Sequence, residues 1–242
     1  MSGSDAEDFA AMALSLHDEQ TLDETLDRVL EYAMKAVACD HAGVLFVHGK
    51  KQVETVAATD DLVSRLDQVQ IDHQQGPDLE VVRSPADAVV VNDTHLDERW
   101  PRWSSAVAGA GIRSMLGIRL YTSTTTIGSL NFYARRPSHF APEDVDVANI
   151  FARHAAVALS AARETANLWR AIDARRLIGQ AQGILMERFD LDADRAFDFL
   201  RRQSQAHNVK LRYVAEWVVD HRNSPDATFE TPQLSPEQTP AN

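Results

Sequence analysis

The 242-residue sequence has one cysteine and no long hydrophobic run. Cys39 cannot form an internal disulfide, and its apolar neighbours in MKAVACD predict a core side chain rather than a nucleophile. No stretch approaches the roughly 18 uninterrupted apolar residues of a membrane span, and the acidic opening MSGSDAEDFA does not match a signal peptide. We therefore expect a cytoplasmic protein that does not contact a membrane.

Metal-binding and catalytic motifs are also missing. The nine histidines include no pair at i and i+4, and one cysteine offers at most one thiolate ligand, so no metal centre is expected. His17 lacks the further histidines of a metal phosphohydrolase, and neither GxSxG nor GxxxxGK occurs. The sequence predicts no enzyme activity and no resident cofactor.

Positive charge is scarce overall but concentrated in one region. The formal net charge is -12, which argues against a protein that coats nucleic acid over its whole surface. Between Leu168 and Arg222, however, ten Lys or Arg stand against eight Asp or Glu, a balance of +2. The remainder of the chain therefore carries -14, and the two regions differ in their electrostatics.

Hydrophobic periodicity predicts a mixed α+β region first. Residues 8–38 have helical spacing with Thr21 as a cap, and β-rich runs at Ala42–Val47 and Val53–Ala57 form a hairpin. The expected order continues with a short helix in GPDLEVVRS, a strand in AVVVND, an irregular segment containing DERWPRW, and paired strands in IRSMLGIRLY and TIGSLNFYA. This order predicts an antiparallel sheet with flanking helices.

The second region is predicted to be helical. No proline follows Pro142 before Arg188, so one long helix is expected there. A seam spaced near 3.5 residues, with two polar members, favours a coiled-coil homodimer through residues 142–188. The seam consists of Ile150, His154, Val157, Ala161, Glu164 and Leu168.

Two shorter amphipathic helices complete the second region, the first capped by Asp192. Residues 223–242 are polar and proline-containing, and are expected to be a disordered tail. The side chains expected to be buried are Ala196, Phe199 and Leu200 in the first helix and Val214, Ala215, Val218 and Val219 in the second.

Two segments resemble known families. Residues 20–162 resemble a GAF domain through GPDLEVV, AVVVND, DERWPRW with AGIRSMLGIRL, and IGSLNFYA leading to FAPEDVDVANIFARHAAVAL. Residues 168–222 resemble the ANTAR module of bacterial transcription antitermination regulators through RRLIGQAQGILMERF, DADRAFDFLRRQSQAHNVKL and VAEWVV. The pairing resembles one-chain regulators found particularly in actinobacteria. It implies a signal-responsive sensor domain joined by the long helix to a three-helix bundle. That bundle would dimerise through its first helix and bind nascent RNA at two adjacent hexaloop hairpins, which blocks terminator formation.

The segment RRLIGQAQGILMERF places two glycines on an expected helix. Ile178, Ala181, Leu185 and Met186 are predicted to face inward, which puts Gly179 and Gly183 on the outward side. Glycine permits close approach of a backbone or nucleotide, and arginine binds phosphates or stacks on unpaired bases. The predicted RNA contacts are Arg175, Gln182, Gly183, Arg188, Arg201, Ser204, Gln205, Asn208, Lys210 and Arg212. At Gln182 the family commonly has lysine, so a hydrogen bond would replace a phosphate contact.

Other interpretations of these residues stay open. The glycines could permit a close helix crossing, and Asn208 could end a helix in the left-handed conformation. The arginine pairs could be solvated surface paired to Asp173 or Asp198. The chain could instead be a DNA-binding regulator, although its last helix offers few base-reading side chains, or a dimeric signalling adaptor that binds no nucleic acid.

The GAF resemblance suggests an unidentified small-molecule ligand. Asp93, Trp100 and Trp103 would lie on the lid side of its pocket, but tryptophans in such a loop also commonly anchor it to the core. Asp78 stands in GPD where cysteine-sensing relatives have GPC, so thiol or bilin chemistry is not expected. The cyclic-nucleotide signature of some GAF domains is also missing.

Overall fold

The computed structural model describes residues 15–16, 19, 21–49, 52–123 and 125–223. The chain divides into two compact units, residues 1–164 and 165–242. The start of the first predicted helix and residues 224–242 of the predicted tail lie outside the described residues. No described helix is both long enough and apolar enough to cross a bilayer.

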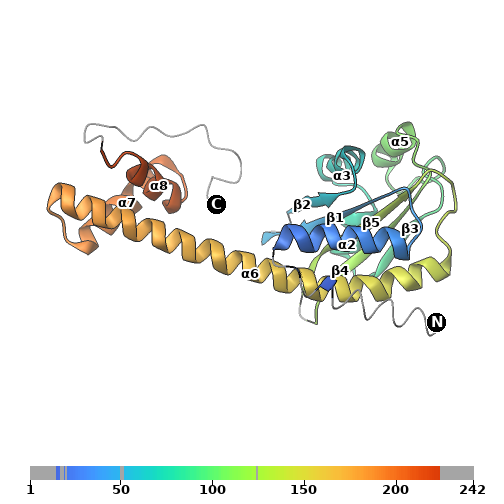
Figure 1. Ribbon diagram of the computed structural model, residues 1–242. Helices are drawn as coiled ribbons and strands as arrows, with labels where there is room; N and C mark the ends of the chain where they lie inside the picture. The colour runs from blue at the N-terminus through green and yellow to red at the C-terminus, as the bar shows by residue number, and fades with distance from the viewer. Residues whose placement is uncertain (1–14, 17–18, 20, 50–51, 124, 224–242) are drawn as a thin grey trace. The chain divides into compact units, whose positions relative to one another are not determined.

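A five-stranded antiparallel sheet forms the centre of the first unit (Figure 1). Its strand order is β2-β1-β5-β4-β3, and every neighbouring pair is antiparallel. The strands are β1 (His41–Val47), β2 (Val53–Ala58), β3 (Ala88–Val91), β4 (Ser114–Tyr121) and β5 (Thr126–Ala134). The predicted antiparallel sheet with flanking helices is confirmed.

One face of the sheet is covered by α2 (Leu22–Ala36) and the first part of α6 (Pro142–Phe189). Thr21 caps α2 as predicted, because its hydroxyl accepts from the Glu24 amide and the Glu24 carboxylate accepts from the Thr21 amide. Apolar side chains of both helices pack against the strands on this face. These include Val29 and Ala33 of α2, Phe132 of β5, and Phe151 and Ala155 of α6.

The opposite face carries α3 (Asp61–His73), α4 (Pro77–Arg83) and α5 (Pro101–Gly109), and a second hydrophobic core lies beneath them. Two of these helices differ from the expectation. DERWPRW is not wholly irregular, because Pro101 begins α5 at the first helical turn, where proline is well tolerated. α3 was not expected at all, and its buried face contains Asp67 and Gln70, which interrupt the apolar pattern.

The second unit is a bundle formed by the last part of α6, α7 (Ala193–His207) and α8 (Leu211–Asp220). Asp192 caps α7 as predicted, accepting from the Arg195 amide at 2.8 Å. The prediction that Met186 faces inward is wrong: its side chain is 37% exposed. The neighbouring helices cover only a narrow stripe of α6, and Met186 lies about 100° around the helix from Leu185.

The remaining core predictions agree with the bundle, either as buried residues or as half-buried residues packed against the core. The buried ones are Ala181, Leu185, Ala196, Leu200, Val214, Ala215 and Val218, and the half-buried ones are Ile178, Phe199 and Val219.

Candidate nucleic-acid interface and a buried carboxylate pair

The two glycines of α6 lie on an open side of the helix. A methyl group added at Gly179 or Gly183 would meet no described atom within 4 Å. No described segment of the unit therefore packs against them, so a close helix crossing within the chain does not explain them. Arg175 is also exposed on this helix. The glycines leave α6 open to approach by another molecule.

Gly183 and Arg188 line a groove of about 650 Å³ between α6 and the end of α8, here called the Arg188 groove. The Arg188 guanidinium donates to the backbone carbonyls of His221, at 3.2 Å, and Arg222. These carbonyls lie just beyond the last turn of α8, where a cation interacts favourably with the helix dipole. Arg188 therefore holds α8 against α6.

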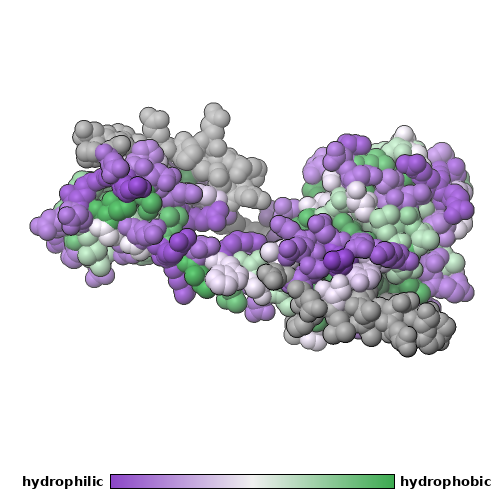
Figure 2. Space-filling model, in the orientation of Figure 1, coloured by the Kyte–Doolittle hydropathy of each residue, from purple (hydrophilic) through white to green (hydrophobic). Residues whose placement is uncertain are grey.

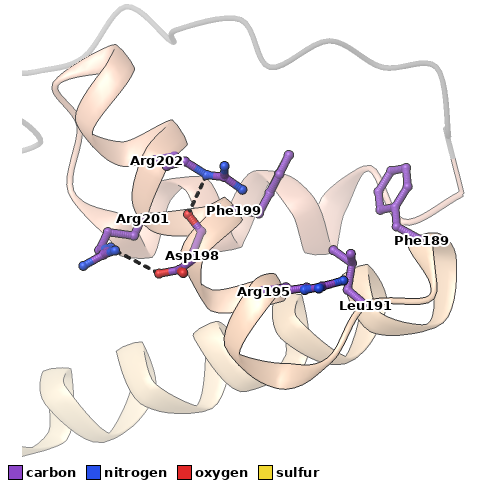
Figure 3. A pocket seen from close by; sticks show the side chains of 7 residues that line it. All are labelled: Phe189, Leu191, Arg195, Asp198, Phe199, Arg201 and Arg202. Carbon is purple, nitrogen blue, oxygen red and sulfur yellow. Dashed lines mark hydrogen bonds and ion pairs between the residues drawn. The ribbon is translucent and has the colours of Figure 1, made fainter.

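A second groove, of about 590 Å³, lies between the end of α6 and α7 (Figure 3). It is called the Phe189 groove, and its lining combines aromatic, apolar and guanidinium groups. The lining residues are Phe189, Leu191, Arg195, Asp198, Phe199, Arg201 and Arg202. Figure 3 shows the side chains of Phe189 and Phe199 projecting to the same side of the ribbon. The Phe189 ring is 52% exposed.

Positive charge exceeds negative charge in the Phe189 groove. Asp198 is the one acid among the lining residues, and its carboxylate pairs with Arg201 at 2.9 Å. The Arg202 Nε donates to the Asp198 backbone carbonyl at 3.3 Å, but no described carboxylate lies within ion-pair distance of its guanidinium. Of the predicted RNA contacts only Arg201 lines this groove. The interleaved aromatic and arginine residues of RAFDFLRR were the signal that could have identified it.

Three predicted contacts lie at the end of α7 and in the turn that follows it: Ser204, Gln205 and Asn208. The backbone of Asn208 is left-handed, with φ 51°, and its backbone N–H donates to the backbone carbonyl of Gln205 at 3.3 Å. The Ser204 hydroxyl donates to the Val209 carbonyl at 2.6 Å. The helix-ending role considered for Asn208 is therefore the one that its geometry shows.

Lys210 and Arg212 follow this turn and are exposed. The Arg212 guanidinium lies 4.5 Å from the centre of the Tyr213 ring and donates to the Tyr213 hydroxyl. Gln182 is half-buried, and its amide donates to the Ala193 carbonyl at 3.1 Å, which connects α6 to the start of α7. The predicted contacts are thus distributed over all three helices. The side chains of three of them donate to the backbone of the bundle itself: Gln182, Arg188 and Ser204.

In the first unit, Asp93 makes a bidentate ion pair with Arg113, with contacts of 3.0 and 2.6 Å. The Arg113 guanidinium lowers the pKa of Asp93. Trp100 and Trp103 pack edge to face, with ring centres 5.9 Å apart, and both are buried in the core beneath α3 and α5. This arrangement matches the loop-anchoring interpretation of the tryptophans.

The same sheet face contains a buried pair of carboxylates that the sequence analysis did not identify. Asp67 of α3 and Asp78 of α4 are both 0% exposed. The Asn131 amide donates to Asp67 at 2.8 Å and to Asp78 at 3.2 Å. Asp67 also accepts from the Tyr133 and Thr55 hydroxyls, and Asp78 accepts from the Gln70 amide at 2.6 Å.

Burial controls the protonation of this pair. Desolvation, followed by the charge of Asp78, raises the pKa of Asp67 to about 7. Desolvation also raises the pKa of Asp78 to about 6, against the hydrogen bonds that favour its charged form. All the side-chain partners named for the pair are neutral, so no described cation compensates its charge.

Small residues of the sheet make room for these polar groups. A Cβ at Gly43 would lie 2.6 Å from the Asn131 Oδ1, and one at Gly117 would lie 3.2 Å from the Asp78 Oδ1. Both glycines pair with Asn131 across the strands. The polar cluster is therefore fitted into the sheet and is not a surface feature.

Cys39 is half-buried, and its burial, with the charge of Asp40, raises the pKa of its thiol to about 12. The reactive thiolate is therefore scarcely populated near neutral pH, as expected for a core cysteine.

An α+β domain with helices on both sheet faces, followed by a small helical bundle with a basic groove, defines a two-domain chain. Family models assign both parts: a GAF domain matches residues 19–160 and an ANTAR domain matches residues 166–219. The chain therefore belongs to the GAF domain family and carries an ANTAR domain after it. This architecture fits a regulator with an RNA-binding output. No curated protein shows significant similarity to the sequence.

Solved structures support the fold of the first domain. The GAF domain of an Acinetobacter phosphoenolpyruvate-protein phosphotransferase is 14% identical with a TM-score of 0.54, covering 69% of this chain and 99% of that one. A free methionine-R-sulfoxide reductase from Neisseria meningitidis is 15% identical with a TM-score of 0.52, covering 64% and 87%. A bacteriophytochrome from the photosynthetic bacterium R. palustris is 9% identical with a TM-score of 0.53, covering 76% and 42%.

Proposed function

We propose that this chain is a signal-responsive transcription antitermination regulator. Its ANTAR domain binds nascent RNA at two adjacent hexaloop hairpins and so prevents terminator formation. The GAF domain receives the signal, from a small ligand or a protein partner. The protein acts in the cytoplasm, where transcripts are made, and performs no catalysis.

One observation carries the proposal. The ANTAR match at residues 166–219 coincides with the part of the chain that combines a positive charge balance with exposed arginines beside exposed aromatic side chains. Guanidinium groups bind phosphates and stack on bases, and aromatic rings stack on bases of any sequence. An unpaired hairpin loop offers both phosphates and splayed bases.

The proposal includes a homodimer formed through the helix at residues 142–188. Near the start of the second unit, α6 exposes a cluster of large apolar residues, Leu168, Trp169 and Ile172, at 60%, 62% and 51%. Figure 2 shows hydrophobic surface along α6. Three adjacent exposed apolar residues on one helix favour contact with a second copy, because association would remove them from water. A dimer would also match two binding bundles to two hairpins.

Binding measurements on the full chain test the proposal. We expect a retarded complex with RNA that carries two hexaloop hairpins, weaker binding when one hairpin is deleted, and no stable complex with duplex DNA of the same length. Tight binding to the duplex alone would favour the DNA-binding alternative. Failure to bind either nucleic acid would favour a dimeric adaptor.

Arginine variants separate specific contacts from general charge. Arg175→Ala and Arg201→Ala should weaken RNA binding, since both residues are exposed and were predicted as contacts. Arg99→Ala is a matched control: this exposed arginine lies in the first unit and pairs with Asp97. Equal losses of RNA affinity in all three variants would show that only the net charge of the protein matters, and not contacts made by Arg175 or Arg201.

A further inference from the structure

We propose that the Phe189 groove binds one unpaired base of the RNA loop together with its phosphate. The base would stack against the exposed aromatic surface, and the phosphate would contact the Arg202 guanidinium. This assignment rests on the proposed RNA-binding function and adds a specific site to it. Six of the groove's seven lining residues were not among the predicted contacts, and Arg201 is the exception.

The size of the groove suits such a ligand. Its volume of about 590 Å³ lies within the roughly 300–1,000 Å³ typical of small-ligand sites. Phe189 is 52% exposed, so a loop base can reach it directly from solvent.

The aromatic and apolar lining supplies the stacking surface. Phe199 is half-buried and packs against the bundle core, so its ring is held in place. Phe189 ends α6, and Asp190 next to it has a left-handed backbone, with φ 52°. That turn directs the chain back toward α7, which brings Leu191 into the same lining. A base inserted here would cover apolar surface that now faces water.

The charges of the groove identify an anionic occupant. Three guanidinium groups and one carboxylate line it, which leaves an excess of two positive charges. The carboxylate of Asp198 is already paired with Arg201, and Arg195 lies 3.5 Å from the Asp192 carboxylate. Arg202 has no described carboxylate partner. It is the lining cation with a guanidinium available for a phosphate.

Arg202 is also held in place for this contact. Its Nε donates to the Asp198 backbone carbonyl of the preceding turn, as Figure 3 shows. That bond leaves the two terminal nitrogens for an oxyanion. Arginine is suited to this role because its planar fork binds phosphate oxygens bidentately and also stacks on bases.

Substitutions at Phe189 test the stacking contact in full-length protein with the two-hairpin RNA. Phe189→Ala should weaken binding by about 5- to 150-fold, the range for loss of one base-aromatic stack. Phe189→Tyr should keep the affinity, because a ring is retained, whereas Phe189→Leu should not. Phe197→Ala is the matched control, since Phe197 is 38% exposed on α7 but does not line the groove. Unchanged melting temperatures would show that the variants remain folded.

The phosphate contact has a separate readout. Arg202→Ala should weaken binding and lower the slope of log affinity against log salt by about one. Phe189→Ala should leave that slope unchanged, because stacking releases no counterion. Arg176→Ala is the control, an exposed arginine of α6 outside the groove that pairs with Asp173.

Crosslinking locates the base directly. RNA with 5-iodouridine at single loop positions should, on irradiation, attach to a peptide that contains Phe189 or Phe199. One combination of results would overturn the groove assignment while the proposed function stands. In it, the wild-type protein binds this RNA, Phe189→Ala and Arg202→Ala bind it with unchanged affinity, and the crosslinks form outside the groove. Wild-type protein that does not bind the RNA would overturn both. If Phe189→Ala weakens self-association and leaves RNA affinity unchanged, the groove is a protein interface, and the assignment is also overturned.

Discussion

Asp67 and Asp78 share the side-chain amide of Asn131, which donates to one carboxylate at 2.8 Å and to the other at 3.2 Å. One amide thus connects α3 and α4 to the centre of β5, on the sheet face that also carries Trp103. Two buried carboxylates this close repel each other when both are ionised. The pair therefore retains protons in a pH range where ordinary aspartates are charged.

The stability of the first domain should fall as the pH rises from about 4 to about 7. The pKa of Asp67 is raised to about 7 and that of Asp78 to about 6, so the folded domain binds protons more tightly than the unfolded chain. This stabilisation is complete below the ordinary aspartate pKa and is lost as the pH passes the raised values. Calorimetric unfolding of the GAF domain across this range measures the effect.

Asp78→Asn should remove much of that pH dependence. The amide oxygen can replace the carboxylate oxygen that accepts from Gln70 and Asn131, and the amide group lacks the charge that burial disfavours. We expect a gain of about 1–3 kcal/mol in unfolding free energy at pH 8 and little change at pH 5. Asp78→Ala is the control, because it leaves a cavity and should destabilise the domain at both pH values. A loss of stability at pH 8 in Asp78→Asn would contradict the explanation.

The buried pair also shows where sequence patterns stop being informative. The strands and α6 were predictable, because alternating apolar runs and a long proline-free segment reflect local preferences. α3 was missed because Asp67 and Gln70 occupy positions where an amphipathic helix normally has apolar residues. Their burial makes sense only with Asn131 and Tyr133, which lie 64 and 66 residues from Asp67 along the chain.

The candidate RNA surface was predictable only in part. The glycines and the exposed Arg175 and Arg201 follow from helical spacing. The backbone contacts of Gln182 and Arg188 do not, because they depend on where α7 begins and α8 ends. The Phe189 groove likewise depends on the turn at Asp190. Residues of two helices that meet through such a turn cannot be paired from spacing alone.

Gly183→Ala should separate stability from binding. Alanine at this open helical position meets no described atom and should raise the stability of the bundle by about 0.5–1 kcal/mol. If the glycine side of α6 contacts RNA closely, the same change should weaken RNA binding by several-fold. Thermal unfolding and gel shifts on one preparation measure both quantities. Gly49→Ala, in an open position of the first unit, should leave RNA binding unchanged.

Arg188→Ala should act mainly through folding. The guanidinium holds the carbonyls of His221 and Arg222 at the end of α8, so its loss should cost the bundle about 1–2 kcal/mol. Arg175 is exposed and has no comparable contact to the backbone of the bundle, so Arg175→Ala should leave the melting temperature unchanged. Weaker RNA binding by Arg188→Ala without any loss of stability would instead show that Arg188 contacts RNA directly.

The exposed apolar side chains of α6 give the final prediction, which concerns self-association. Leu168→Glu and Ile172→Glu place charges on the surface proposed to contact a second copy, and should weaken the dimer at least ten-fold in sedimentation equilibrium. Neither change should unfold the bundle, because both side chains are more than half exposed. Leu96→Glu is the matched control, since Leu96 is 78% exposed in the first unit. If the Leu168 and Ile172 variants associate as tightly as the control, the dimer forms elsewhere. RNA binding gives a second readout. If the Leu168 and Ile172 variants bind two-hairpin RNA as tightly as the wild-type protein does, pairing of two bundles on two hairpins is not the basis of recognition.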